Sequence, residues 1–131
     1  QLNHLVKPGG RVALQAITYP NHTYNQYKKS VDFIKHSIFP GGHLPSLETI
    51  TSLTRQLTHL RLVTATNIAS SYAITLKKWA ENLQTNQKKA KNLGFSSDFL
   101  RRWHYYFAYC EAAFSSDYLG VYQLQFKRNA V

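Results

Sequence analysis

Methionine is absent from this chain of 131 residues, and cysteine occurs once, at Cys110. A single cysteine excludes a disulfide within the chain, which fits a reducing compartment such as the cytoplasm. No apolar run approaches the ~20 residues that span a bilayer, and the first residues show no signal-peptide pattern. We therefore expect a cytoplasmic protein. Because the sequence opens at Gln1 without a methionine, we also expect a piece of a longer chain.

Acidic side chains are scarce. The chain has 6 Asp or Glu residues against 16 Lys or Arg residues, which gives a formal net charge of +10. Such a balance points to a polyanionic partner, either a nucleic acid or an anionic lipid surface. Ordinary solvated faces are the alternative, because most of the basic residues lie on the polar sides of apolar stripes. The short basic clusters lie at residues 28–29, 77–78, 88–91, 101–102 and 127–128.

Repeats, low-complexity tracts and linkers are also missing. With 44% hydrophobic residues, the chain is long enough for one compact domain and too short for two of ordinary size. We therefore treat residues 1–131 as a single unit.

Hydrophobic periodicity predicts an α/β fold. Residues 11–18 carry apolar side chains on both faces, which is typical of a parallel strand covered on both sides, and Gln15 is the polar exception. From residue 23 to 39, apolar residues recur at helical spacing, so we predict one amphipathic helix there.

The rest of the chain continues this alternation. Ser46 is placed to cap a helix that runs to Leu57, and Ser97 or Asp98 to cap a long aromatic helix that runs to Phe114. Gly94 can end a short helix in "KKAKNLGF". We predict strands at 60–69 and 118–128, the latter half-buried near a sheet edge, and a helix at 72–83.

The loop in "HSIFPGGHLPSLETI" has an irregular path that its residues fix, and we call it the shaped loop. Proline fixes φ and glycine permits positive φ, so two prolines and two glycines hold an irregular path between two helical segments. A shaped loop favours a functional site, although a purely architectural turn explains the same residues.

Several motifs together resemble a known family. The segments, in order, are "LQAIT", "IFPGGHLPS", "SYAITLKKWAENL", "FLRRWHYYFAYCEAAF" and "YQLQFKR". Their order and spacing are similar to the C-terminal part of the cyclopropane-fatty-acyl-phospholipid synthase and mycolic acid cyclopropane synthase family. The resemblance implies a class I methyltransferase fold, of which this chain would be the last sheet strands and a helical lipid-side insertion.

The resemblance also implies a reaction. The family uses S-adenosylmethionine to add a methylene across a cis double bond of an acyl chain, and bound bicarbonate removes a proton so that a cyclopropane closes. A phospholipid acyl chain would be the substrate, and the enzyme would lie at the inner face of the membrane, which its positive charge would favour. This chemistry needs a dry apolar groove and aromatic walls that tolerate a cation.

Laid on the family's bicarbonate motif, the sequence places Tyr106, the backbone of Ile17, and Gln15 at the anion. Gln15 stands where the family has a histidine, and its amide can donate a hydrogen bond but cannot act as a base. The Gln15 amide either forms hydrogen bonds within the fold or contacts the anion, and the sequence favours neither alternative. A tyrosine on an apolar stripe is otherwise a core residue whose hydroxyl reaches water or a carbonyl.

The acyl groove would be formed by the shaped loop and by aromatic residues of two helices. Packing in the core is the alternative for Tyr72 and Trp79. The six histidines show no metal-ligand spacing, so we expect no metal. The expected substrate-binding residues are Phe39, Gly41, Gly42, Leu44, Tyr72, Trp79, Trp103 and Phe107.

The cofactor-binding half is expected to lie outside this chain. No Gly-x-Gly-x-Gly turn follows a predicted strand, and such a turn would cradle S-adenosylmethionine. The partners we expect are an upstream half of the domain, an acyl chain and an anionic membrane. The isolated chain should self-associate through uncovered edges and faces and should not transfer methyl groups.

Two other functions remain as alternatives. A basic, aromatic chain suits a module that binds single-stranded nucleic acid by stacking, although most aromatics fall on apolar stripes and no nucleic-acid motif is present. A lipid-binding protein without catalysis is the second alternative.

Overall fold

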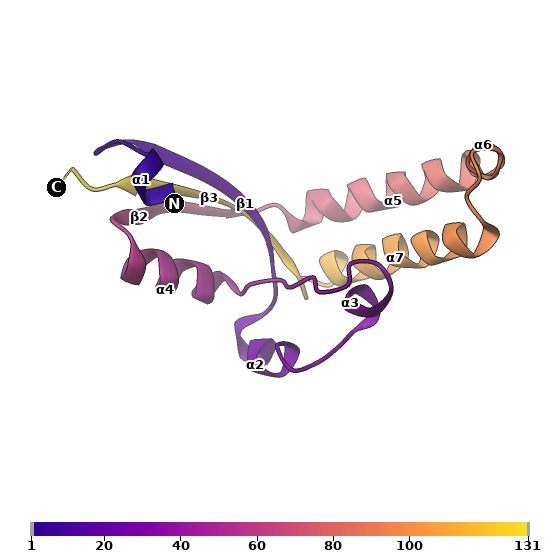
Figure 1. The fold of residues 1–131 in the computed structure, drawn as a ribbon, viewed down its shortest axis with the longest axis horizontal. Helices are drawn as coiled ribbons and strands as arrows, with labels where there is room; N and C mark the ends of the chain where they lie inside the picture. The colour runs from indigo at the N-terminus through magenta and orange to yellow at the C-terminus, as the bar shows by residue number, and fades with distance from the viewer. Residues whose placement is uncertain (1, 131) are drawn as a thin grey trace.

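A three-stranded sheet forms one end of the molecule, and a long helical hairpin extends from it (Figure 1). The computed structural model describes residues 2–130. Strand β3 lies between the other two strands and runs antiparallel to both. The strands are β1 (Arg11–Thr18), β2 (Leu60–Asn67) and β3 (Gly120–Arg128).

The strand predicted at residues 11–18 is present as β1, but its pairing is antiparallel and not parallel as predicted, and within residues 2–130 its two faces are not both covered. β1 pairs antiparallel with β3, and half of its residues are exposed, with Thr18 at its end buried. Within residues 2–130, β1 is hydrogen-bonded to a strand on one side only. Apolar composition records what a strand can bury, but it does not record the direction or number of its neighbours, which is why the prediction failed.

The strand at 120–128 is central and not near an edge as predicted. The alternation itself was predicted well, because Leu124 and Phe126 are buried whereas Gln123 and Gln125 are exposed. The alternation of apolar and polar residues defines the two faces of a strand, but it does not indicate which strands lie beside it. The buried face packs under helix α4 (Leu47–Leu57), where Leu60 joins the same cluster.

Residues 23–39 do not form the single helix that their periodicity predicted. The chain forms three short helices in this region, and residues 28–32 interrupt them. Asp32 begins the last of the three, because its carboxylate accepts from the Lys35 N–H at 2.8 Å. Val31 lies in the interruption and is 74% exposed, so it was not part of a buried stripe. The three are η1 (Asn21–Thr23), α2 (Tyr24–Tyr27) and α3 (Phe33–Ser37).

Helix α4 begins where the sequence predicted. The Ser46 hydroxyl accepts from the Thr49 N–H at 3.1 Å, which satisfies one of the free amides of the first turn. Leu47 and Ile50 then pack on the sheet.

The helical hairpin carries most of the aromatic residues. It consists of α5 (Ala69–Thr85) and α7 (Ser97–Ser115), joined by the short α6 (Gln87–Asn92) at its tip (Figure 1). A one-turn helix, α1 (Leu2–Leu5), precedes the sheet. Gly94, with φ of +95°, follows α6 as predicted.

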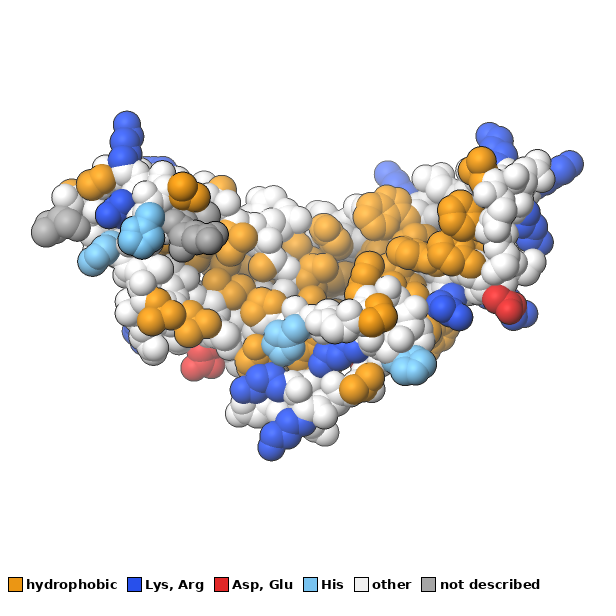
Figure 2. Space-filling model, viewed as in Figure 1, with side chains coloured by type: hydrophobic (Ala, Val, Ile, Leu, Met, Phe, Trp, Pro, Cys, Tyr) orange, Lys and Arg blue, Asp and Glu red, His pale blue; other side chains and the backbone are white. Residues whose placement is uncertain are grey.

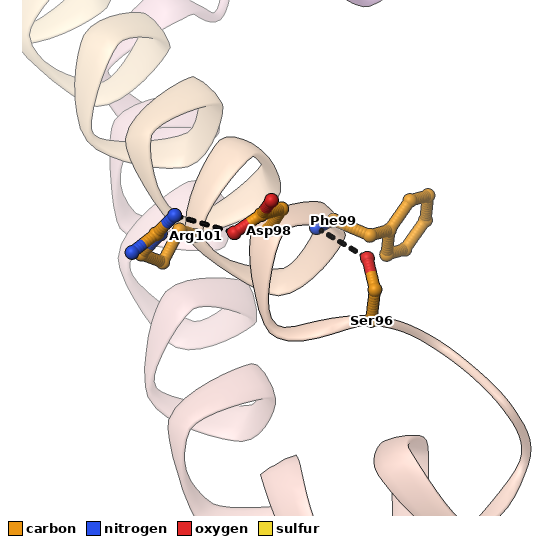
Figure 3. A network of polar contacts seen from close by, with 4 residues as sticks. All are labelled: Ser96, Asp98, Phe99 and Arg101. Atoms are coloured by element: carbon orange, nitrogen blue, oxygen red, sulfur yellow. Dashed lines mark hydrogen bonds and ion pairs between the residues drawn. The ribbon is translucent and has the colours of Figure 1, made fainter.

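The cap of α7 lies one residue before the predicted position. Ser96, and not Ser97 or Asp98, accepts from the Phe99 N–H at 3.1 Å, as Figure 3 shows. Asp98 instead pairs with Arg101 on the surface of the first turn (Figure 3).

The main core lies where the base of the hairpin meets the sheet. Ala69 and Leu76 from α5, Phe114 from α7 and Val121 from β3 are all at most 3% exposed there. The small Ala69 side chain allows the two helices and the sheet to approach closely. The hairpin is therefore anchored at its base, while its tip extends away from the sheet (Figure 1).

Replacement of Leu124 by alanine should lower the free energy of unfolding by about 3 kcal/mol, because the side chain is 0% exposed at the centre of the sheet. Urea denaturation would measure the loss. The control is Leu57→Ala, since Leu57 is 74% exposed on α4 and its loss should cost less than about 0.5 kcal/mol. Equal losses in the two variants would contradict the position of the core.

Candidate functional site

An apolar cavity of about 370 Å³ lies between the helical hairpin and the segment from residue 27 to 44. Its volume is within the range of roughly 300–1,000 Å³ that is usual for ligand pockets. The lining residues are Ile17, Tyr27, Asp32, Ile34, Lys35, Phe39, Gly42, His43, Leu44, Tyr72, Leu76, Trp79, Tyr106, Cys110, Phe114 and Leu119.

A larger depression, of about 650 Å³, lies elsewhere, beside α4 and β2. It is wider open and its walls are mostly polar, with Arg55, His59 and Arg61 among them. We place the candidate site in the smaller cavity, because a concave apolar site excludes water and carries a few convergent polar groups.

One wall of the cavity comes from the hairpin. Tyr72, Leu76 and Trp79 project from α5, and Tyr106 and Cys110 project from α7. Their spacing of three or four residues puts each set on one helix face. The same faces bury Leu76 and Cys110 in the core, so the cavity wall is a direct extension of the packed interior.

The opposite wall is the shaped loop. The Gly42 N–H donates to the Phe39 carbonyl at 2.9 Å, and Gly41 between them has φ of +79°. Proline at the second and glycine at the third position of such a turn is the pattern of type II. A Cβ atom on Gly42 would lie 2.9 Å from the Phe39 carbonyl oxygen, so this position also requires glycine. The turn directs Phe39 and Leu44 into the cavity wall.

Tyr27 holds that loop in place. Its hydroxyl accepts from the Leu44 N–H at 3.1 Å, and its ring stacks on Tyr19 with 3.9 Å between the ring centres. The side chain is 5% exposed, and burial raises the pKa of its hydroxyl. Tyr27 falls within the helix that periodicity predicted over residues 23–39, and this role was missed because no local signal relates it to residue 44.

Lys35 is a second residue that sequence reasoning missed. Its Nζ lies 3.5 Å from the centre of the Tyr27 ring and donates to the carbonyls of Tyr27 and Ser30 at 2.9 and 3.0 Å. Within residues 2–130, no carboxylate forms an ion pair with it. A ring and two carbonyls therefore hold this ammonium group beside the cavity.

Tyr106 lies half-buried in the cavity wall. Its ring meets Phe39 edge to face, with 5.8 Å between the centres. Burial raises the pKa of the hydroxyl to about 12, with smaller contributions from Cys110 and Tyr72. The phenol therefore stays neutral at physiological pH and serves as a hydrogen-bond donor or acceptor, not as an anion.

Cys110, one turn further along α7, is a protonated thiol. It is 5% exposed, and burial raises its pKa to about 11. Reactive cysteines have a lowered pKa and partial exposure, so this residue acts as a small apolar group of the wall.

The structure brings most of the predicted groove residues together. Ile17, Phe39, Gly42, Leu44, Tyr72, Trp79 and Tyr106 all line the cavity. Trp103 and Phe107 do not line the cavity but contact its rings, since Trp103 packs on Tyr106 and Phe107 packs on Trp79. Gly41 shapes the loop without facing the cavity.

Gln15 does not line the cavity. It is exposed on β1, two residues before Ile17 and on the same face of the strand. Its Oε1 accepts from the Nε2 of Gln123, which lies directly opposite on β3, at 3.2 Å. Tyr106 and Ile17 thus share a cavity that Gln15 does not reach.

In the part of the chain that the structure describes, no three His, Cys, Asp or Glu side chains gather as a metal site would require. No helix there has the length and hydropathy needed to cross a bilayer.

Comparison with known proteins identifies a family. The profile described as "Mycolic acid cyclopropane synthetase" matches residues 1–124. Tuberculostearic acid methyltransferase UfaA1 of Mycobacterium tuberculosis (strain ATCC 25618 / H37Rv) is 45% identical over 122 residues, which are 93% of this chain and 29% of that protein. A probable fatty acid methyltransferase of Pseudomonas putida is 31% identical over 91% of this chain and 30% of its own length.

Solved structures resemble the chain over nearly its whole length. The cyclopropane synthase MmaA2 from Mycobacterium tuberculosis superposes with a TM-score of 0.84 at 25% identity, covering 97% of this chain and 47% of that one. Mycolic acid cyclopropane synthase CmaA1, complexed with SAH and CTAB, superposes with a TM-score of 0.78 at 26% identity over 91% of this chain and 44% of that one. These structures confirm the predicted α/β class, with the chain corresponding to the C-terminal part of a class I methyltransferase fold.

Cys110 provides a test of the cavity, because it is the one thiol in the sequence. We expect a maleimide to label it slowly at neutral pH and rapidly in urea, since the folded protein keeps the thiol buried and protonated. Mass spectrometry of the labelled chain would follow the reaction. Labelling of the folded protein at the rate seen in urea would contradict the packing described for α7.

Proposed function

We propose, since the chain belongs to the mycolic acid cyclopropane synthetase family, that it forms the acyl-binding part of an S-adenosylmethionine-dependent lipid methyltransferase. The observation that carries the proposal is the apolar cavity between the hairpin and the Phe39–Leu44 loop. Such a cavity suits a hydrocarbon chain and excludes water from it. The chain spans less than half of the solved relatives and about 30% of the curated ones, so the activity of the whole protein is part of this proposal.

The residues of this chain would bind and orient the substrate. Leu44 and Ile34 offer aliphatic surface, and Tyr106 and Trp79 offer ring surfaces on the other side. Aromatic faces attract positive charge, so these rings would favour charge that develops on an alkene. A fixed chain position would bring one double bond to one place, and positioning of this kind lowers the barrier to reaction.

S-adenosylmethionine does not fit the residues present. In a class I fold its cradle is a glycine-rich turn after a strand. Here β1 is followed by Tyr19 and Pro20, and β2 is followed by Ile68 and the start of α5. We assign the cofactor to a preceding half of the domain and derive no step through it.

Bicarbonate fits this chain in part. Tyr106 offers a neutral hydroxyl in the cavity that Ile17 also lines, whereas Gln15 lies outside it. Because the expected set of three residues is not assembled, we keep Tyr106 and Ile17 as the proposed anion contacts and derive no step through the anion.

The substrate we propose is an unsaturated phospholipid acyl chain at the inner face of a membrane, and the product a cyclopropane. The net charge of +10 supports an anionic surface as the site of action. A methyl-branched product is the second candidate, because a relative with 45% identity is named a tuberculostearic acid methyltransferase. A basic module that binds lipid or single-stranded nucleic acid without catalysis is the alternative that the next experiment addresses.

Tyr106→Phe in the protein that contains this chain should lower methyl transfer to an unsaturated acyl chain by about 10²-fold, the usual effect of removing one positioned hydrogen-bond donor. Mass spectrometry of the lipid product would measure the rate. The control is Tyr105→Phe, since Tyr105 is 55% exposed on the same helix and does not line the cavity. Full activity of Tyr106→Phe would remove the hydroxyl from the mechanism, and absence of any turnover in the parent would favour the non-catalytic module.

The 131-residue chain alone should self-associate and show no methyl transfer. β1 is paired on one side within the described residues, and the Gln15 face of the sheet is exposed. Size-exclusion chromatography should give an apparent mass above the 15.1 kDa of one chain. A clean monomer or a measurable turnover would contradict the expectation.

A further inference from the structure

A continuous strip of aromatic rings leads from the cavity to the tip of the hairpin. Starting at Phe39 in the loop, it passes through Tyr106, Trp103 and Phe99 to Phe95, with neighbouring ring centres between 4.8 and 5.9 Å apart. These spacings are those of packed aromatic pairs. A hydrocarbon chain that lay along the strip would remain in contact with apolar surface from the tip to the cavity.

The outer end of the strip is exposed. Leu93 is 78%, Phe95 45% and Phe99 38% exposed around the turn that joins α6 to α7. Figure 2 shows hydrophobic side chains that extend over α5 and α7 toward the end of the hairpin, where basic side chains surround them. Contiguous exposed apolar surface of this kind marks an interaction site.

The same tip is strongly basic. Residues 77–102 carry seven Lys or Arg side chains and two carboxylates. One of the two, Asp98, pairs with Arg101 and is partly neutralised (Figure 3). Lys88, Lys89 and Lys91 lie on α6 itself, next to Leu93. Apolar side chains and ammonium groups therefore alternate over the same small convex end.

We propose that the tip of the α5–α7 hairpin docks on an anionic lipid bilayer and that the aromatic strip guides an acyl chain from the bilayer to the cavity. This inference rests on the proposed function, because it assumes that the cavity takes an acyl chain. Lysines near an anionic surface are attracted to its charge, while leucine and aromatic side chains enter the boundary between headgroups and acyl chains. The hairpin is anchored at its sheet end, so its tip can meet a surface without disturbing the core.

Charge alone would also attract an acidic protein. The composition of the tip favours a bilayer, because the buried part of protein interfaces is poor in lysine whereas here lysines lie between the exposed apolar residues. The strip gives a second reason, since its exposed end at Leu93 and Phe95 has no use in a purely electrostatic contact.

Binding of the 131-residue chain to vesicles tests the proposal directly. Both tryptophans of the sequence, Trp79 and Trp103, contact the ring of Phe107 beside the strip, so their fluorescence reports on it. Phosphatidylglycerol vesicles should shift the emission to the blue, and brominated acyl chains should quench it. Phosphatidylcholine vesicles should do neither at the same lipid concentration.

Matched variants distinguish binding through the tip from attraction by the overall positive charge. Lys88→Gln with Lys89→Gln should weaken partition into phosphatidylglycerol vesicles by about 30-fold, because each lysine near the surface contributes about five-fold. The matched pair, Lys28→Gln with Lys29→Gln, lies at the end of α2, away from the tip (Figure 1), and should change partition by less than about three-fold, because salt screens charges that are distant from the docked surface. Equal losses in the two pairs would overturn the proposal.

Leucine variants test insertion in the same way. Leu93→Ser should weaken partition about ten-fold by removing a side chain that enters the bilayer. Leu57→Ser, at a residue 74% exposed on α4, should leave partition unchanged. Circular dichroism would establish that each variant is folded. Absence of bromine quenching, or tighter binding of the parent to poly-glutamate than to vesicles, would overturn docking on a bilayer.

A soluble ligand keeps the two proposals distinguishable. A short unsaturated fatty acid should slow maleimide labelling of Cys110 if the cavity binds acyl chains, whether or not vesicles bind. Protection of Cys110 without vesicle binding would overturn the docking proposal alone. Vesicle binding without protection would overturn the acyl cavity and with it the guiding role of the strip.

Discussion

The cavity depends on how Tyr27 ties the Phe39–Leu44 loop to the rest of the chain. The loop has few regular backbone hydrogen bonds of its own, and the Tyr27 hydroxyl accepts the one from the Leu44 amide. The ring that carries this hydroxyl lies between Tyr19 and the Lys35 ammonium group. Burial of the Tyr27 ring thus holds the loop in position, and the space between the loop and the hairpin is the site.

A single stripe on α7 performs three tasks along its length. Phe114 at the base is 3% exposed and belongs to the core, Tyr106 in the middle is half-buried in the cavity wall, and Phe99 near the tip is 38% exposed. The change follows the distance from the sheet, because β3 and α5 cover the stripe at its base and leave it open toward the tip. Periodicity alone describes all three positions as core, so burial of the stripe had to come from the tertiary structure.

The sequence predicted the positions of helices and strands better than it predicted which segments lie beside them. Ser46 begins α4 and Gly94 follows α6, as predicted, and the buried and exposed faces of β3 follow the alternation of its residues. The interruption at 28–32 was missed because Val31 and Ile34 keep helical spacing across it, and the Asp32 cap is equally compatible with a solvated helix. The cavity residues in the loop, the helices and β1 were predicted from the family motifs. Tyr27 and Lys35 were missed because Tyr27 acts on Leu44, which is distant in sequence, and Lys35 acts on Tyr27, which is absent from those motifs.

The register of β1 against β3 determines the hydrogen-bond partner of Gln15. Its place opposite Gln123 follows from the pairing of β1 with β3, and Gln123 donates to its oxygen. An amide carries two donors on nitrogen besides that acceptor, and among residues 2–130 the Gln15 nitrogen donates to no protein group. The structure therefore favours the first of the two interpretations that the sequence left open, because the Gln15 oxygen is satisfied by Gln123 while its nitrogen lies outside the cavity that Ile17 and Tyr106 line.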